Sequence, residues 1–76
     1  MTGSEVTTHT IGISVNGEHR VVPAGTTLGG LVLTLTSAHS GVAAAVNEAV
    51  VPRGQWHVTT LGGGDRVEVL TAVQGG

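Results

Sequence analysis

The segment of residues 10–23 most constrains the fold, because it holds two strand patterns joined by Asn-Gly. In "TIGISV" apolar side chains occupy every second position, at Ile11, Ile13 and Val15, which is the pattern of a strand with one apolar face. "HRVVP" follows as a second strand that ends at Pro23. Asn16-Gly17 between the two strands is a strong signal for a tight turn. These residues predict a β-hairpin at the start of the domain.

The register of this hairpin depends on the length of its loop. A two-residue loop places Ile13 opposite Arg20, whereas a three-residue loop from Asn16 to Glu18, with a bulge, places Ile13 opposite Val21. We predict the second register, because it keeps the apolar residues of both strands on one face.

Residues 26–40 combine a helical pattern with residues that disfavour a helix. Apolar side chains recur at the spacing of one helix face, at Leu28, Leu31, Val32 and Leu35. Thr26 or Thr27 can cap the start, and Gly41 is placed to end the helix. Against this reading, Gly29 and Gly30 each cost about 1 kcal/mol relative to Ala, and the leucines also alternate as in a strand. We predict a helix that is held by packing against a sheet.

The second half of the chain reads as short strands followed by a longer one. Residues 42–46 and 49–51 form two strands joined near Asn47-Glu48, and "RGQWHV" crosses over with room for one helical turn. After the "LGGGD" turn, "RVEVLTAV" is the final strand, with one face formed by Val67, Val69 and Thr71 and the other by Glu68 and Leu70. This order predicts an α+β, ubiquitin-like β-grasp fold, a mixed sheet of four to five strands wrapped on one helix. We expect residues 10–73 to form the domain, between flexible tails at 1–9 and 74–76.

Composition excludes several classes of function. The formal charge of −2 argues against a nucleic-acid-binding protein, and the sequence holds no stretch of 18 apolar residues that could span a membrane. The first ten residues lack the features of a secretory signal, so we expect a cytoplasmic location. The histidines and acidic residues show no spacing typical of a metal site or of general acid–base catalysis. There is no Cys and no Lys.

Three side chains are candidates for the core or for a partner surface. Trp56, the single aromatic residue, is expected to close one edge of a small aliphatic core. Arg53 lies beside a Pro turn, where it faces either solvent or a partner. Leu70 is expected to point away from the helix, and apolar neighbours around it would form a partner patch.

The chain ends in Gly75-Gly76. Two glycines can enter a narrow channel, because they lack side chains, and residues 73–76 can reach at most about 13 Å into another protein. The terminal carboxylate has a pKa of about 3.5 and is therefore ionised and unreactive at neutral pH. No P-loop motif is present that could activate it, so the chain would be the substrate of an activating enzyme.

From residue 42 to the end the sequence resembles the sulfur carrier proteins of thiamine biosynthesis. The resemblance rests on the N-x-x-V-V-P-R-x-x-W block, the Gly-Asp turn and the terminal Gly-Gly, that is, on Asn47, Val50, Val51, Pro52, Arg53, Trp56, Gly64, Asp65, Gly75 and Gly76. The hairpin and the leucine-rich segment of the first half have a similar layout. The resemblance covers roughly residues 10–76.

The resemblance implies a carrier protein that is not itself an enzyme and binds no cofactor or metal. An adenylating enzyme of the ubiquitin-activating type would join AMP to Gly76, using ATP and Mg²⁺. A cysteine desulfurase system would supply sulfur, and thiazole synthase would take it from the resulting thiocarboxylate. The interface candidates are Leu70, Glu68, Val73, Gln74 and Arg53.

Three other functions fit parts of the sequence. The small subunit of molybdopterin synthase has the same fold and the same kind of terminus, but the V-P-R-x-x-W block favours the thiamine carrier. A protein modifier would join its terminus to lysines of other proteins. A β-grasp interaction module would keep its partner binding without Gly75-Gly76.

Overall fold

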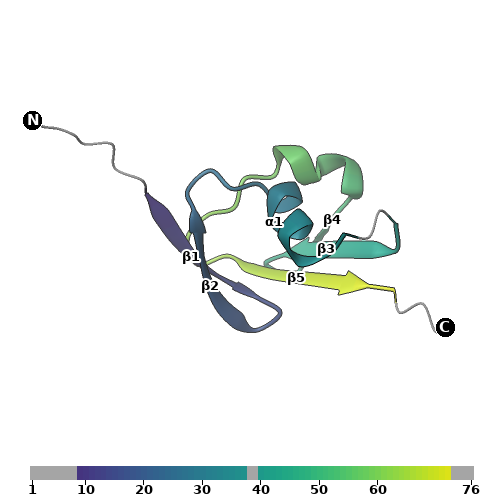
Figure 1. Cartoon of the computed structure of the whole chain (residues 1–76), viewed down its shortest axis with the longest axis horizontal. Helices are drawn as coiled ribbons and strands as arrows, with labels where there is room; N and C mark the ends of the chain where they lie inside the picture. Colours follow the sequence, from purple (N-terminus) through teal and green to yellow (C-terminus); the bar gives the residue numbers. More distant parts are fainter. Residues whose placement is uncertain (1–8, 38–39, 73–76) are drawn as a thin grey trace, which may run out of the picture.

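The computed structural model describes residues 9–37 and 40–72, which form five strands, one α-helix and one 3₁₀ helix (Figure 1). In chain order these are β1 (Thr10–Val15), β2 (Glu18–Pro23), α1 (Leu28–Leu35), β3 (Val42–Val46), β4 (Ala49–Val51), the 3₁₀ helix η1 (Arg53–Val58) and β5 (Arg66–Thr71). The predicted order of elements is confirmed, including the helical turn after β4. No helix in the described part is long and apolar enough to cross a membrane.

The strands form one mixed sheet in the order β2-β1-β5-β3-β4. β5, the last strand along the chain, is therefore the middle strand of the sheet. It runs parallel to β1, with Val15 beside Val67, and antiparallel to β3, with Ala44 beside Val69. The outer neighbours, β2 on β1 and β4 on β3, are antiparallel hairpins.

The core lies between one face of this sheet and α1. From the helix it takes Leu28, Leu31 and Val32, while Leu35 packs at its margin, so the predicted apolar stripe is confirmed. β5 contributes Val67 and Val69 and turns Glu68 and Leu70 to the other face, as its alternation predicts. The remaining buried apolar residues are Ile13, Val15, Ala44, Trp56 and Leu61.

The predicted register of the first hairpin is wrong. Ile13 pairs with Arg20, and the loop contains only two residues. Asn16 and Gly17 have φ angles of 51° and 84°, so both occupy the left-handed region that a two-residue type I′ turn requires. The turn, rather than apolar matching, sets the register. β2 is an edge strand, and only its Val22, opposite Ile11, packs against the core.

The helix begins as predicted but ends early. Thr27 caps it, since its side-chain oxygen accepts a hydrogen bond of 3.1 Å from the Gly30 amide. The helix ends at Leu35, with Thr36 already extended, so the prediction that Gly41 ends it is wrong. Threonine is a weak helix former, and Thr34 in the last turn and Thr36 directly after the helix both disfavour a further turn. Gly41 instead has a φ of 72° and precedes β3.

Candidate functional site

The predicted reactive end of the chain, Gly75 and Gly76, lies outside the described residues, as do Val73 and Gln74. The structure therefore shows the base from which that segment leaves the domain. At this base β5 ends at Thr71, and the amide of Ala72 donates a hydrogen bond of 2.6 Å to the carbonyl of Gly41. The chain thus remains paired with the residue just before β3, Gly41, up to Ala72, the last described residue before the terminus.

On its other side β5 is held by the side chain of Asn16. The Asn16 Oδ1 accepts a hydrogen bond of 2.9 Å from the Val69 amide, and its Nδ2 donates one of 3.1 Å to the Val69 carbonyl. The backbone amide of Asn16 also donates to the Val67 carbonyl, at 2.8 Å. A single side chain thus continues the β1–β5 ladder beyond the end of β1. The sequence marked Asn16 only as a turn residue, because this contact spans 53 positions.

A second asparagine fixes the other end of β5. Asn47 has a φ of 52° in the β3–β4 turn, and its Oδ1 accepts a hydrogen bond of 3.0 Å from the Arg66 amide. Its Nδ2 donates at 3.1 Å to Asp65, whose other carboxylate oxygen accepts from Gly62 at 2.7 Å. The Asn and the Gly-Asp turn that carry the family resemblance are therefore in direct contact and set where β5 begins.

The face of the sheet opposite α1 carries an apolar patch around Leu70. This side chain is 69% exposed, and it pairs across the strands with Ala43. Next to it, Glu68 pairs with Ala45, which pairs in turn with Val50, itself 76% exposed. We call Ala43, Ala45, Val50 and Leu70 the open-face patch. The predicted orientation of Leu70 is confirmed; Ala43 and Val50 could not be assigned to the patch before the strand pairing was known.

Arg53 is not part of the open-face patch. It lies at the start of η1, which packs beside α1 on the other side of the sheet (Figure 1). Its guanidinium stands over the ring of Trp56, 5.3 Å from the ring centre. Trp56 is buried and donates a hydrogen bond of 2.8 Å from Nε1 to the Val51 carbonyl, which confirms its predicted place at the edge of the core. The sequence-predicted interface residues therefore separate, with Leu70 and Glu68 on one side of the sheet and Arg53 on the other.

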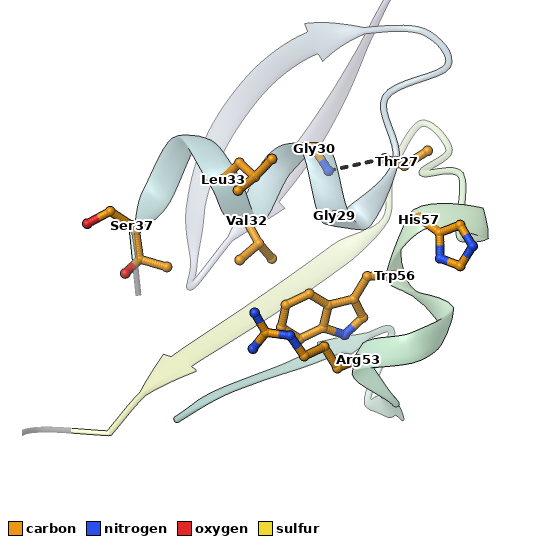
Figure 2. A pocket seen from close by; sticks show the side chains of 10 residues that line it. Thr27, Gly29, Gly30, Val32, Leu33, Ser37, Arg53, Trp56 and His57 are labelled. Atoms are coloured by element: carbon orange, nitrogen blue, oxygen red, sulfur yellow. Dashed lines mark hydrogen bonds between the residues drawn. The ribbon is translucent and has the colours of Figure 1, made fainter. Parts of the chain in front are cut away.

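A groove of about 480 Å³ separates α1 from η1. Figure 2 shows Trp56 and Arg53 along one side of it and the helix residues Gly29, Gly30 and Leu33 along the other. No cluster of three or more His, Asp or Glu side chains that could hold a metal ion occurs within residues 9–37 and 40–72.

Comparison with known proteins places these features in a family. The model of the ThiS family matches residues 9–76. A thiazole synthase from Magnetococcus marinus is 42% identical over 64 residues; the match covers 84% of this chain but only 20% of that relative. The chain thus spans about a fifth of that curated relative's length. Among solved structures, the thiamine biosynthesis protein ThiS from Geobacter metallireducens superposes with a TM-score of 0.71 at 29% identity, covering 87% of this chain and all of that one.

Proposed function

The chain belongs to the ThiS family and has its ubiquitin-like β-grasp fold, and from this premise we propose that its terminal glycine carries sulfur as a thiocarboxylate for thiazole formation. The observation that carries the proposal is the extent of the family match. It runs through residue 76 and so includes both terminal glycines together with Asn47 and Asp65, which are in contact at the start of β5.

The chemistry of the terminus requires activation by another protein. Adenylation joins an oxygen of the Gly76 carboxylate to the α-phosphorus of ATP and releases pyrophosphate. A cysteine desulfurase system supplies sulfur as a protein persulfide, whose terminal sulfur attacks the Gly76 carbonyl carbon while AMP leaves. A thiol then attacks the protein-side sulfur of the resulting acyl disulfide, which releases the thiocarboxylate and leaves the thiol in a new disulfide. The product is a thiocarboxylate whose sulfur is a nucleophile for the next enzyme. In this scheme ATP and Mg²⁺ are bound by the activating enzyme.

The absence of Cys and Lys supports a carrier of this kind. With no Cys in the chain, a persulfide has no side chain to occupy, so the sulfur is carried at the terminus. With no Lys, the activated terminus meets no side-chain amine on its own chain. The relative named thiazole synthase supports that class of enzyme as the sulfur acceptor, and it favours the thiamine pathway over the molybdopterin pathway.

We propose the open-face patch as the surface that docks the activating enzyme. Leu70 belongs to the same strand that leads to Gly76, six residues further along the sequence. At up to about 3.5 Å per extended residue, this separation allows an enzyme seated on Leu70 to receive the terminus about 20 Å away.

An intact-mass experiment tests the proposed function. Incubation of the whole chain with the cognate activating enzyme, ATP and a sulfur source should add about 16 Da, the difference between sulfur and oxygen at the activated terminus. A chain that lacks Gly75 and Gly76 is the matched control and should gain no mass. If the whole chain keeps its mass while the enzyme is demonstrably active, the carrier function is excluded; if the truncated chain keeps its biological role, the interaction-module reading holds instead.

A further inference from the structure

We infer that the groove between α1 and η1 is a second docking surface, which receives a partner segment that combines apolar side chains with a carboxylate. This inference rests on the proposed function, in that the partners considered are the enzymes that act on the terminus. It concerns a different side of the molecule from the open-face patch.

The groove has two walls that are fastened to each other. At the start of α1 the amide of Leu28 donates a hydrogen bond of 2.8 Å to the carbonyl of Thr59, just after η1. Val32 and Trp56 line the groove and also belong to the buried core. Leu33 also lines it but is 78% exposed. An open apolar groove with a large exposed side chain on its lining is suited to a protein segment, since contiguous exposed apolar surface marks partner sites.

The two glycines of α1 keep this groove hollow without being required by the fold. Neither Gly29 nor Gly30 has a positive φ. A Cβ at Gly29 would lie 3.5 Å from atoms of Trp56, and one at Gly30 would lie 3.4 Å from the Thr27 Oγ1, both ordinary contacts. Gly disfavours a helix interior more than any residue except Pro. Alanine would therefore fit and would strengthen the helix, but it would narrow the groove.

The positive charge of Arg53 in the groove indicates that the bound segment carries a carboxylate. Among the described residues, the lining of the groove contains the guanidinium of Arg53 and no Asp or Glu, although the whole chain is negatively charged. The ion pair found among the described residues joins Arg66 to Glu48. Within this part of the chain, therefore, no carboxylate neutralises Arg53. Stacking on Trp56 holds the guanidinium over the apolar surface, as Figure 2 shows. A guanidinium presented in this way can bind a carboxylate through two parallel hydrogen bonds.

The position of the groove leaves the open-face patch free. α1 and η1 cover one side of the sheet, whereas Leu70 faces the other. An enzyme can therefore bind in the groove while the open-face patch is also bound. The patch is then in contact either with another part of the same enzyme or with the next protein that acts on the terminus.

The test measures binding of the whole chain to its cognate activating enzyme and to its cognate thiazole synthase. Arg53→Glu reverses the charge of the groove, and Gly30→Leu fills it with a good helix former. Arg20→Glu, the same charge change on the exposed edge strand β2, is the matched control. Because Trp56 is the single Trp, 5-fluorotryptophan places one ¹⁹F reporter beside the groove and none on the partners.

For at least one of the two enzymes, we expect both groove variants to weaken binding about tenfold or more. Arg20→Glu should leave that affinity unchanged, and binding should shift the ¹⁹F signal. The inference is overturned if neither enzyme distinguishes the groove variants from wild type, if Arg20→Glu weakens binding as much as Arg53→Glu, or if neither enzyme binds the chain. Circular dichroism verifies that the variants fold. Failure of the proposed function is recognised separately, because the wild-type chain would then gain no sulfur in the intact-mass assay.

Discussion

Replacement of Asn16 should loosen the strand that leads to the terminus. Asn16→Gly keeps the left-handed turn but removes both side-chain hydrogen bonds to Val69. Each hydrogen bond contributes a net of about 0.5–1.5 kcal/mol to stability, so the free energy of unfolding of the variant should fall by about 1–3 kcal/mol. A domain of this size has a total stability of about 4–11 kcal/mol, so the loss is readily measured. Asn16→Ala should lose about 1–2 kcal/mol more, because its Cβ disfavours the φ of 51°.

Urea denaturation followed by Trp56 fluorescence measures these losses, and amide hydrogen exchange locates them. In Asn16→Gly the Val69 amide loses its acceptor and should exchange faster than the global loss of stability explains. The Leu70 amide is an internal reference, because Leu70 pairs with Ala43 on the opposite side of β5. The reasoning is refuted if Asn16→Gly costs less than about 0.5 kcal/mol, or if exchange at Val69 and Leu70 rises equally.

Three further changes test the patch, the core and a turn. Leu70→Asp should weaken binding of the activating enzyme without unfolding the chain. Val21→Asp, which also places Asp at an exposed apolar position (Val21 in β2 is 61% exposed), should leave binding unchanged. If a titration gives Leu70→Asp the affinity of the wild type, Leu70 is not part of the interface. Trp56→Ala should cost about 3–5 kcal/mol in thermal or urea unfolding, and a negligible shift of the midpoint would contradict its burial. Glu48→Gly should raise the free energy of unfolding by about 1 kcal/mol, because glycine adopts the φ of 71° at this position without strain. The variant loses only an exposed ion pair with Arg66. If urea unfolding shows that the variant is less stable than the wild type, the ion pair contributes more than the backbone strain costs.

Local patterns predicted much of the fold. The alternation of Val67 and Val69 with Leu70 assigned the two faces of β5, and the spacing of Leu28, Leu31 and Val32 assigned the buried face of α1. In both cases each side chain's environment follows from the geometry of its own element. The early end of the helix was missed because Gly41 was given more weight than the poor propensity of the threonines before it.

Features that depend on distant contacts could not be predicted in the same way. The first hairpin was placed in the wrong register because the prediction assumed that Ile13 would face an apolar partner. On an edge strand that condition is weak, so the φ preferences of Asn16 and Gly17 decide. The groove was missed because Gly29-Gly30 counted only as a cost to the helix. The role of these two glycines in the groove depends on η1, which follows more than 20 residues later in the sequence and packs beside them.

The position of β5 in the sheet has a consequence for synthesis on the ribosome. Before residues 66–71 have emerged, the nascent chain contains the segments of two hairpins, β1–β2 and β3–β4. In the native sheet these hairpins are not neighbours, because β5 lies between them. Hairpins of this size are at best marginally stable in water, and the core still lacks Val67 and Val69. Folding must therefore wait for β5. A chain that stalls before β5 stays open to proteases, so the folded population consists of molecules that already possess the strand from which the terminal glycines extend.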